Sequence, residues 1–469
     1  MASYVVKNAS TNGQYYTYNL TDPDEYANHV NNGAYTNAGI AQLLQWATTA
    51  SQIVGQAPDP QWADIINNIY IPQQQNIDLT LEYSGMNSST LIKQADVVLL
   101  TYPLEFNQSS ARAVNNLNYY AQKQSPNGPA MTYAIFAVDV AQLSTQGCSA
   151  YTYLLYSSQP YIRYPFYQFS EQLVDNPNLN GGTNPAFPFL TGHGGHLQVY
   201  THGLTGYRAN QSGLYLDPTL PPQMTDGYSL TGLKYNGGVF DINITLTNTT
   251  ITRRADWKYS NLNGSYFPEG PGKPINVIIG SRNPKAGNYS LQINGTLTVP
   301  TYRPDLNGSA IDGNLVQCKP ILSEDAWVPG KFPLSLNDGD NSTFWQPLTP
   351  SFSTAFIDLG NVTTFSSAYF LWGNEPPLAI SLGIDSFSGG NISIAQANAT
   401  SFQWIVSNYS VSINQPYSSN QTNSSSIVIY PGNDTTLKLN STYSSRYIQV
   451  AIEGSYTDNG GTLAELALM

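Results

Sequence analysis

The spacing of apolar residues changes near residue 210, and this change limits what the chain can fold into. Before it, apolar side chains recur about every 3.6 positions, for example at Ile40, Leu44 and Ala47, which predicts helices. After it, apolar residues such as Phe240 and Ile242 alternate with polar ones, which predicts strands. We therefore expect separate helical and β domains.

The predicted elements follow this division. Helices are expected over residues 38–56, 109–124, 129–146 and 148–157. Polar loops that carry aromatic residues are expected over 58–76 and 159–188, which suits a site on one rim of a helical scaffold. Strands are expected over 240–246, 291–293, 297–299, 355–359, 426–430 and 447–452. The chain of 469 residues is then divided into a helical domain (1–212) and two β-domains (213–304 and 305–469).

The composition is typical of an extracytoplasmic glycoprotein. Only 10% of the residues are charged, against roughly one quarter in ordinary soluble domains. Many Asn residues open N-x-Ser/Thr triplets, among them Asn8, Asn19, Asn87, Asn243, Asn294, Asn341 and Asn440. Glycans on these sites would supply the solubility that charged side chains do not.

Charge and hydropathy exclude two classes of partner. The net charge of −12, without any basic run, argues against binding to nucleic acid. The sequence contains no apolar stretch of about 20 residues, so we expect no transmembrane helix.

The first residues also lack the basic-then-apolar pattern of a signal peptide, and we expect the targeting segment in upstream sequence.

The chain has two cysteines, Cys148 and Cys318, which fall in different predicted domains. A disulfide between them is possible, but the sequence does not imply one. Two cysteines cannot form a metal framework.

An acidic turn is the feature that most clearly indicates chemistry. Asp22, Asp24 and Glu25 lie within four residues, beside Tyr26. Crowded carboxyl groups raise one another's pKa values, and a raised pKa suits a general acid. The alternative is a structural turn in which Asp22 caps a helix.

The stretch TDPDEYANHVNNGAYTN, residues 21–37, resembles the general-acid motif of glycoside hydrolase family 65. That family includes disaccharide phosphorylases, which usually read GPDEY here, and acid trehalases; Asp22 stands in place of the Gly. The resemblance implies that Glu25 is the catalytic acid and that Tyr26 contacts the substrate. It also implies that residues 1–212 form the C-terminal half of an (α/α)6 barrel, an all-α fold, followed by two β-sandwich domains.

A second segment, IKQADVVL, residues 92–99, also resembles the family. There the Lys-Gln pair donates hydrogen bonds to the non-reducing glucose, a role that Lys93 and Gln94 inherit by resemblance. Without the resemblance, Lys93 would be read as a solvated surface lysine.

A hydrolase also needs a base that activates water, and Glu171 is the candidate. Its S-E-Q segment resembles the base-bearing segment of glucoamylases, which share the barrel. Two carboxyl groups separated by about 6.5–9.5 Å leave room for a water and invert the anomeric carbon. The alternative is a surface glutamate in a loop.

The segment FLTGHGGH, residues 189–196, resembles the phosphate-binding loop of the phosphorylases. They carry a Ser where this chain has Gly192, and this loss of an anion donor favours water over phosphate. His193 is expected to contact substrate or to pack. Together with His196 and His202 it could suggest zinc, but the spacing does not fit a helical zinc motif, and no metal site is predicted there.

The last domain resembles the discoidin (factor 5/8 type C) module, a jelly-roll β-sandwich that often binds glycans. The resemblance rests on the segments at residues 336–340, 343–345, 356–360 and 445–448. Asp338 and Asp340 could ligate a calcium ion there, since Ca²⁺ binds clustered oxygens. A turn capped by the two Asp side chains is the equally weighted alternative.

The resemblance implies a cofactor-independent, inverting α-glucoside hydrolase that cleaves α,α-trehalose into two glucose molecules outside the cell, in the cell wall or periplasm, or in the vacuole. Hydrolysis of kojibiose or another α-glucobiose, or phosphorolysis, remains open. A third possibility is a non-catalytic carbohydrate-binding fragment. Because the family's barrel begins upstream of its DEY motif, we expect an N-terminal half of the same enzyme as a partner.

Overall fold

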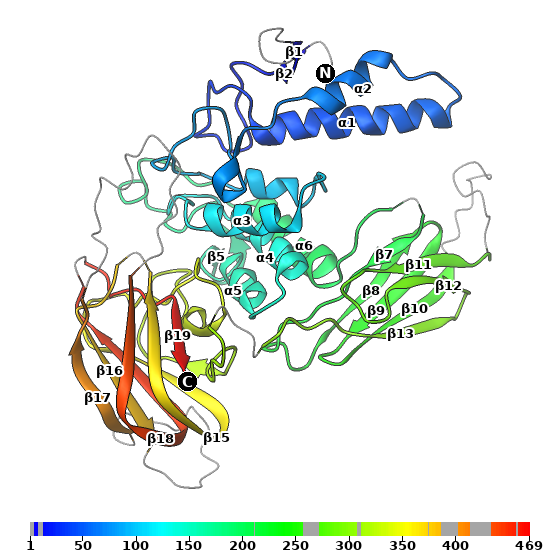
Figure 1. The fold of residues 1–469 in the computed structure, drawn as a ribbon. Helices are drawn as coiled ribbons and strands as arrows, with labels where there is room; N and C mark the ends of the chain where they lie inside the picture. Colours follow the sequence, from blue (N-terminus) through cyan, green and yellow to red (C-terminus); the bar gives the residue numbers. More distant parts are fainter. Residues whose placement is uncertain are drawn as a thin grey trace.

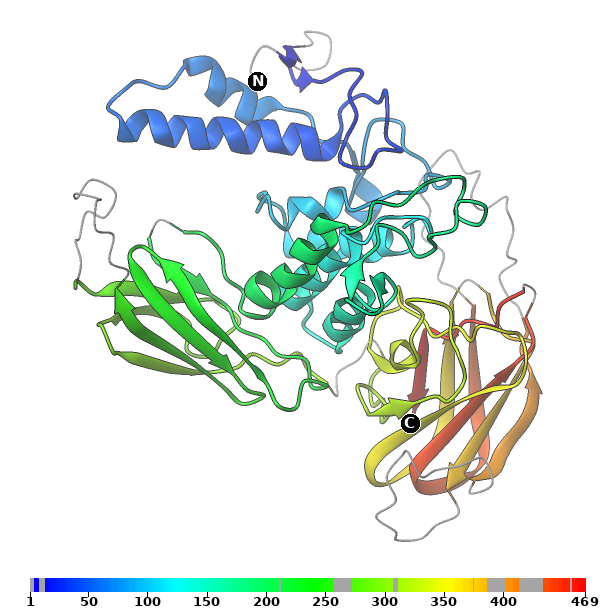
Figure 2. The same cartoon turned by 180° about the vertical axis from the view of Figure 1, so that it is seen from behind.

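The computed structural model describes residues 4–7, 13–210, 212–256, 272–306, 311–373, 375–385, 402–412, 433–455 and 458–469. The chain is a multidomain protein in which helices precede sheets (Figure 1). Helices α3 to α6 form the middle of the molecule, and the two β regions lie on opposite sides of it in both views (Figure 2). The predicted order of helical and β regions is therefore confirmed.

Six α-helices occur in the described part of the chain. They are α1 (Ala34–Ile53), α2 (Pro60–Asn68), α3 (Ser110–Ala121), α4 (Thr132–Leu143), α5 (Ser149–Tyr156) and α6 (Leu190–Gln198). The four predicted helices correspond to α1, α3, α4 and α5. The prediction that 58–76 is only a loop was wrong, because α2 lies within it. The sequence does carry its start signal, since the Asp59 carboxylate accepts a hydrogen bond from the Gln61 amide and Pro60 occupies the first turn.

Helix α4 is the centre of the helical core. Its sequence is apolar on nearly all sides, as expected for a helix surrounded by others. It packs against α3, α5, α6 and a π-helical stretch, η4 (Val199–Leu204), that continues α6. Helix α1 differs, because its N-terminal half is buried whereas Trp46 and Ile53 are exposed further along it. No helix in the described ranges is long and apolar enough to cross a membrane.

The first β region consists of two sheets with a common core. One has the order β13-β10-β9-β8 and the other β12-β11-β7. The strands are β7 (Leu214–Leu216), β8 (Tyr228–Tyr235), β9 (Gly238–Ile244), β10 (Asn248–Asp256), β11 (Ile275–Ile279), β12 (Gly287–Leu291) and β13 (Thr296–Pro300). Asn236 and Gly237 both have positive φ and form the turn that joins β8 to β9. The alternating residues Phe240, Ile242 and Ile244 are buried.

The second β region is a six-stranded sheet, as far as the structure describes it, with its own core. Its order is β14-β15-β18-β16-β17, and β19 pairs with β15. The strands are β14 (Ile321–Leu322), β15 (Ser353–Trp372), β16 (Ala379–Asp385), β17 (Phe402–Ser410), β18 (Asn433–Glu453) and β19 (Glu465–Leu468). The predicted strands 355–359 and 447–452 lie in β15 and β18, and 426–430 lies outside the described residues. Trp345 and Trp372 are buried in the core rather than exposed.

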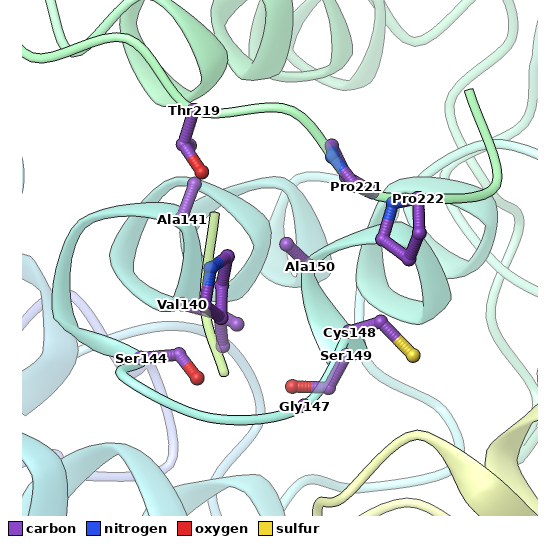
Figure 3. A pocket seen from close by; sticks show the side chains of 11 residues that line it. Val140, Ala141, Ser144, Gly147, Cys148, Ser149, Ala150, Thr219, Pro221 and Pro222 are labelled. Carbon is purple, nitrogen blue, oxygen red and sulfur yellow. The ribbon is translucent and has the colours of Figure 1, made fainter. Parts of the chain in front are cut away.

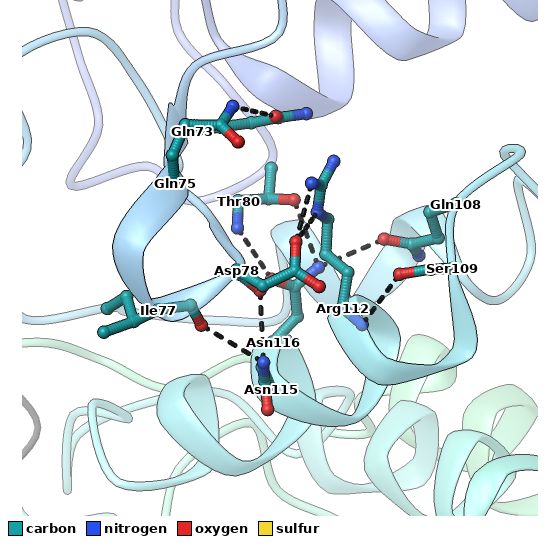
Figure 4. Close-up of polar contacts among 10 residues, drawn as sticks. All are labelled: Gln73, Gln75, Ile77, Asp78, Thr80, Gln108, Ser109, Arg112, Asn115 and Asn116. Atoms are coloured by element: carbon teal, nitrogen blue, oxygen red, sulfur yellow. Dashed lines mark hydrogen bonds and ion pairs between the residues drawn. The ribbon is translucent and has the colours of Figure 1, made fainter.

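In the described residues, the helical region also contains six very short strands, four before α3 and two after α5. They are β1 (Val6–Lys7), β2 (Tyr15–Tyr16), β3 (Gln73–Gln74) and β4 (Leu79–Thr80), and β5 (Ile162–Arg163) pairs with β6 (Gln168–Phe169) further along. Figure 4 shows how polar side chains of α3 hold the β3–β4 hairpin. Arg112 forms an ion pair with Asp78, and Asn116 Oδ1 accepts a hydrogen bond of 2.9 Å from the Thr80 amide. This hairpin leads into the segment that contains the candidate site.

The second β region is attached to the helices covalently. Cys148, at the start of α5, forms a disulfide with Cys318. The Thr152 hydroxyl of α5 also donates a hydrogen bond of 2.5 Å to Asp338. The possible bridge is therefore present, and it joins the two regions 170 residues apart in sequence.

Replacing both cysteines by serine should lower the free energy of unfolding by about 2–5 kcal/mol, because the cross-link restricts the unfolded chain. Differential scanning calorimetry would measure the loss as a lower Tm. A reductant should lower the Tm of the parent protein but leave the double variant unchanged. Equal Tm values for parent and variant would contradict this assignment.

Candidate active site

The acidic turn that contains Glu25 is closed by backbone contacts. Leu20 and Val30 pair as an antiparallel bridge, and the Ala27 amide donates a hydrogen bond of 2.9 Å to the Asp24 carbonyl. The turn leaves no room beside the carboxyl group of Asp22, since a Cβ on Gly33 would lie 1.8 Å from Asp22 Oδ2. Within this turn, Asp22 and Asp24 point into the protein and are buried, whereas the side chain of Glu25 is 61% exposed.

Glu25 and Lys93 form an ion pair, so the structure brings the two predicted residues together. Burial lowers the pKa of the Lys93 ammonium, but the contact with Glu25 and the nearby charge of Glu171 outweigh this effect and raise it above its usual value. Tyr26 acts on Lys93 in the same direction and is half exposed beside it. One ammonium group therefore lies near both predicted catalytic carboxyl groups.

Gln94 has a structural contact in this state of the protein. Its side-chain amide donates a hydrogen bond of 2.6 Å to the carbonyl oxygen of Pro23, and the residue is buried. Lys93 and Gln94 thus hold their segment against the acidic turn through two contacts, one with Glu25 and one with Pro23.

Glu171 follows β6 and is held by three hydrogen bonds. The Ala130 amide donates to its carbonyl oxygen over 2.8 Å, and its own amide donates to the Ala186 carbonyl over 3.0 Å. The Ala186 amide donates to Glu171 Oε2 over 2.8 Å. The carboxylate is therefore fixed between the segment before α4 and the segment before α6, rather than free in a loop.

His193 belongs to helix α6 and packs beneath β6. Its Nε2 accepts a hydrogen bond of 3.1 Å from the Phe169 amide, and its ring lies 4.6 Å from the Phe169 ring, centre to centre. The segment that resembles the phosphate-binding loop of the phosphorylases forms this helix. Gly192 is needed there, because a Cβ would lie 2.9 Å from Phe169 Cδ1 and 3.1 Å from Ala130 Cβ. His193 thus supports strand β6, which lies two residues before Glu171.

Burial raises the pKa values of carboxyl groups behind the site. It raises the pKa of Asp22 to about 6, against an opposing hydrogen bond from the Thr36 hydroxyl, and it also raises that of Asp24. Glu82 and Asp96 are buried next to them, and burial together with the neighbouring acids raises the pKa of Glu82 to about 11. The sequence analysis missed Glu82 and Asp96. Their signal was a single acid between apolar neighbours, as in Leu81-Glu82-Tyr83.

Asp338 and Asp340 lie elsewhere, at the contact between α5 and the second β region. Asp338 is buried and Asp340 is partly buried, and desolvation raises the pKa values of both carboxyl groups. Asp338 accepts hydrogen bonds from the hydroxyls of Thr152 and Thr343. Among the residues that the structure describes, no group of three or more His, Cys, Asp or Glu side chains is arranged to hold a metal ion. Asp338 Oδ1 and Asp340 Oδ1 also accept hydrogen bonds from the amides of Asp340 and Ser342, as in a capped turn.

Within the described ranges, two hollows can be compared with the acidic turn, and both lie away from it. One lies between α4, α5 and the segment 219–222 (Figure 3), and its volume of about 10 Å³ is close to that of one water probe. It is too small for a sugar. The other is an open groove of about 370 Å³ that includes Tyr151, His196 and Tyr200. Neither contains Glu25 or Glu171.

The chain is similar in sequence to known glycoside hydrolases. Residues 3–86 match the family described as the glycosyl hydrolase family 65 central catalytic domain. The chain is 37% identical over 473 residues to a cell wall acid trehalase of Arthroderma benhamiae, covering 97% of this chain and 44% of that protein. It is 42% identical over 419 residues to a periplasmic/secreted acid trehalase of Candida glabrata, covering 81% of this chain and 33% of that protein. The chain is thus a relative of the glycoside hydrolases of family 65. It is similar to acid trehalases, and it spans less than half of their length.

The likeness extends to proteins with another substrate. A protein-glucosylgalactosylhydroxylysine glucosidase of Danio rerio is 33% identical over 250 residues, which cover 53% of this chain and 36% of that protein. Among solved structures, one described as "Putative kojibiose phosphorylase from human microbiome" covers 64% of this chain and 41% of that chain, with 14% identity and a TM-score of 0.46.

Asp22 gives a prediction about pH. A folded-state pKa of about 6, above the usual 3.8, means that the folded protein binds this proton more tightly than the unfolded chain does. The stabilisation is complete below about pH 4 and is lost as the pH rises through about 6, a change of roughly 3 kcal/mol. Asp22→Asn should therefore lose less stability between pH 4 and pH 7 than the parent, as measured by urea unfolding. The same loss in both proteins would contradict the shifted pKa.

Proposed function

We propose that this chain is the catalytic-acid-bearing part of an inverting acid trehalase that acts outside the cell. The observation that carries the proposal is the placement of Lys93, which forms an ion pair with Glu25 and lies within the electrostatic influence of Glu171. The similarity to cell wall and periplasmic/secreted acid trehalases supports both the substrate and the location.

Each residue has a role in the proposed reaction. Glu25 protonates the glycosidic oxygen, and Glu171 removes a proton from the water that attacks the anomeric carbon from the opposite face. Lys93 and Gln94 donate hydrogen bonds to the non-reducing glucose once sugar replaces their present partners. Tyr26, half exposed beside Glu25, offers a flat surface for the sugar ring.

Position 192 favours hydrolysis over phosphorolysis. The close packing of Gly192 against Phe169 and Ala130 leaves no space for a hydroxyl-bearing side chain. A phosphate ion would therefore lack that donor and would also approach the negative charge of Glu171. Kojibiose and other α-glucobioses remain alternative substrates of the same mechanism.

We also propose that residues 1–212 are part of an (α/α)6 barrel that an N-terminal half of the same enzyme completes. Apolar side chains exposed on helices support this proposal, since a buried position is their usual environment. They include Trp46, Ile53, Leu190 and Leu197. The domain boundaries 213–304 and 305–469, and a glycan-binding role for the last domain, are further parts of the proposal.

Glu25→Gln and Glu171→Gln should each lower trehalose hydrolysis at acidic pH by about a hundredfold or more, because general acid and base each contribute about that much. NMR of the released anomers, with the chain alone and together with the upstream half, would measure the rate and the stereochemistry. Glu324→Gln, at an exposed position in the last domain, is the matched control and should keep the parent rate.

Inversion predicts that one α- and one β-glucose appear initially in equal amounts, without any requirement for phosphate. A Glu25→Gln rate close to that of the control would remove Glu25 from the role of acid. Release of glucose 1-phosphate in the presence of phosphate would instead assign a phosphorylase. No hydrolysis even with the upstream half would favour a carbohydrate-binding fragment.

A further inference from the structure

Four carboxyl groups are buried together behind Glu25 and Lys93, and donors are lacking for several of their oxygens. The residues are Asp22, Asp24, Glu82 and Asp96, each at most 4% exposed. Five of their oxygens are without a hydrogen-bond partner in the described part of the chain: Asp22 Oδ2, Asp24 Oδ2, Asp96 Oδ1 and both oxygens of Glu82. Buried acceptors that face one another without donors repel, so protons are needed between them.

Two of the three remaining oxygens of this buried acid cluster connect the two segments of the candidate site, and the third, Asp22 Oδ1, accepts a hydrogen bond from the Thr36 hydroxyl. Asp24 Oδ1 accepts hydrogen bonds from the backbone amides of Tyr26, over 3.1 Å, and Lys93, over 2.9 Å. Asp96 Oδ2 accepts a hydrogen bond of 3.0 Å from the Asp24 amide. The cluster therefore fixes the backbone on which both Glu25 and Lys93 stand.

The groups around the cluster supply little positive charge, so bound protons are the main means of neutralising its carboxylates. Lys93 is the cation that acts on Asp24, and its ammonium already contacts Glu25. On α3, burial and the charge of Glu82 raise the pKa values of the Tyr119 and Tyr120 hydroxyls. On α1, burial and the charge of Asp96 raise the pKa of Tyr35. The Tyr120 hydroxyl donates its hydrogen bond to the Thr80 carbonyl, away from the carboxyl groups.

We propose that Asp24, Glu82 and Asp96 share protons, and that this sharing holds residues 23–26 against residues 93–96 and so positions Glu25 and Lys93 under acidic conditions. A protonated Glu82 donates its O–H to Asp24, which leaves Asp24 Oδ1 free to accept from the two amides. When the contact opens, these acids reach water and release the shared protons, so opening becomes more favourable as the pH rises above their ordinary pKa values. The role as positioning residues rests on the proposed function, but the proton sharing does not.

The electrostatic environment supports this arrangement. Burial raises the pKa of Glu82 to about 11, and burial also raises that of Asp96 well above its usual value. The carboxyl groups of Glu82 and Asp24 lie close enough to share a proton, and this contact raises the pKa of Glu82 and lowers that of Asp24, as expected for a proton held on Glu82. For acids whose folded pKa is raised, stability is greatest below the unfolded pKa and falls as the pH increases through the folded pKa.

Hydrogen exchange of the full chain, between pH 5 and pH 8 and corrected for intrinsic exchange rates, tests the proposal locally. The peptides to follow span residues 21–28 and 91–97, which contain the amides of Tyr26 and Lys93. In the parent, their protection should fall by about tenfold or more over this range, the equivalent of one pKa unit. In Glu82→Gln the side-chain amide donates to Asp24 at every pH, so the protection should fall less steeply than in the parent, and the remaining slope comes from Asp22 and Asp96.

Glu324→Gln makes the same chemical change at an exposed carboxyl group and should behave like the parent. Parallel pH dependence in parent and Glu82→Gln would overturn the proposal. So would protection in the parent that is independent of pH but lost on adding a chelator, because a bound cation would then neutralise the cluster. These readouts require no trehalose, so they are independent of the outcome of the activity assay.

Should Glu82→Gln fail to fold, Asp96→Asn provides the second test. Its side chain keeps an acceptor for the Asp24 amide and removes one acid, so the Tm should fall less steeply with pH than in the parent. Glu324→Gln is again the comparison. A slope as steep as that of the parent would contradict proton sharing within the cluster.

Discussion

The carboxylate of Asp24 connects the two chain segments on which the candidate site depends. It accepts hydrogen bonds from the Tyr26 and Lys93 amides, which lie 67 positions apart in the numbering (93 − 26). A buried carboxylate without such donors would be costly, and donors without it would be left unpaired. The geometry of Glu25 and Lys93 is therefore set by a buried side chain beside them rather than by their own exposed contact.

The carboxyl group of Glu171, the candidate base, is positioned by different means. Glu171 stands at the end of a short hairpin, and backbone hydrogen bonds from Ala130 and to Ala186 fix its segment. Glycine at 192 permits α6 to approach closely enough for His193 to cap the Phe169 amide. Helical packing around α4 thus determines where Glu171 lies, whereas a buried polar network determines where Glu25 lies.

The helices and many of the strands could be predicted from the sequence, because periodicity reports which face of an element is buried. Helix α2 could have been found from Asp59-Pro60 but was obscured by its polar surroundings. The motifs indicated Glu25, Lys93 and Glu171, whereas Glu82 and Asp96 were missed. Their importance arises from burial beside other acids distant in sequence, which no local pattern records.

Burial of acids and the scarcity of charge have a common physical consequence. With 10% charged residues, the chain has few cations that could neutralise buried carboxylates. Around Asp24, Glu82 and Asp96, the structure pairs carboxyl groups with backbone amides and with one another. Such an arrangement is most stable where protons are abundant, because each shared proton removes a charge from a medium of low dielectric constant. An acidic environment therefore suits both the surface of this chain and the interior of its candidate site.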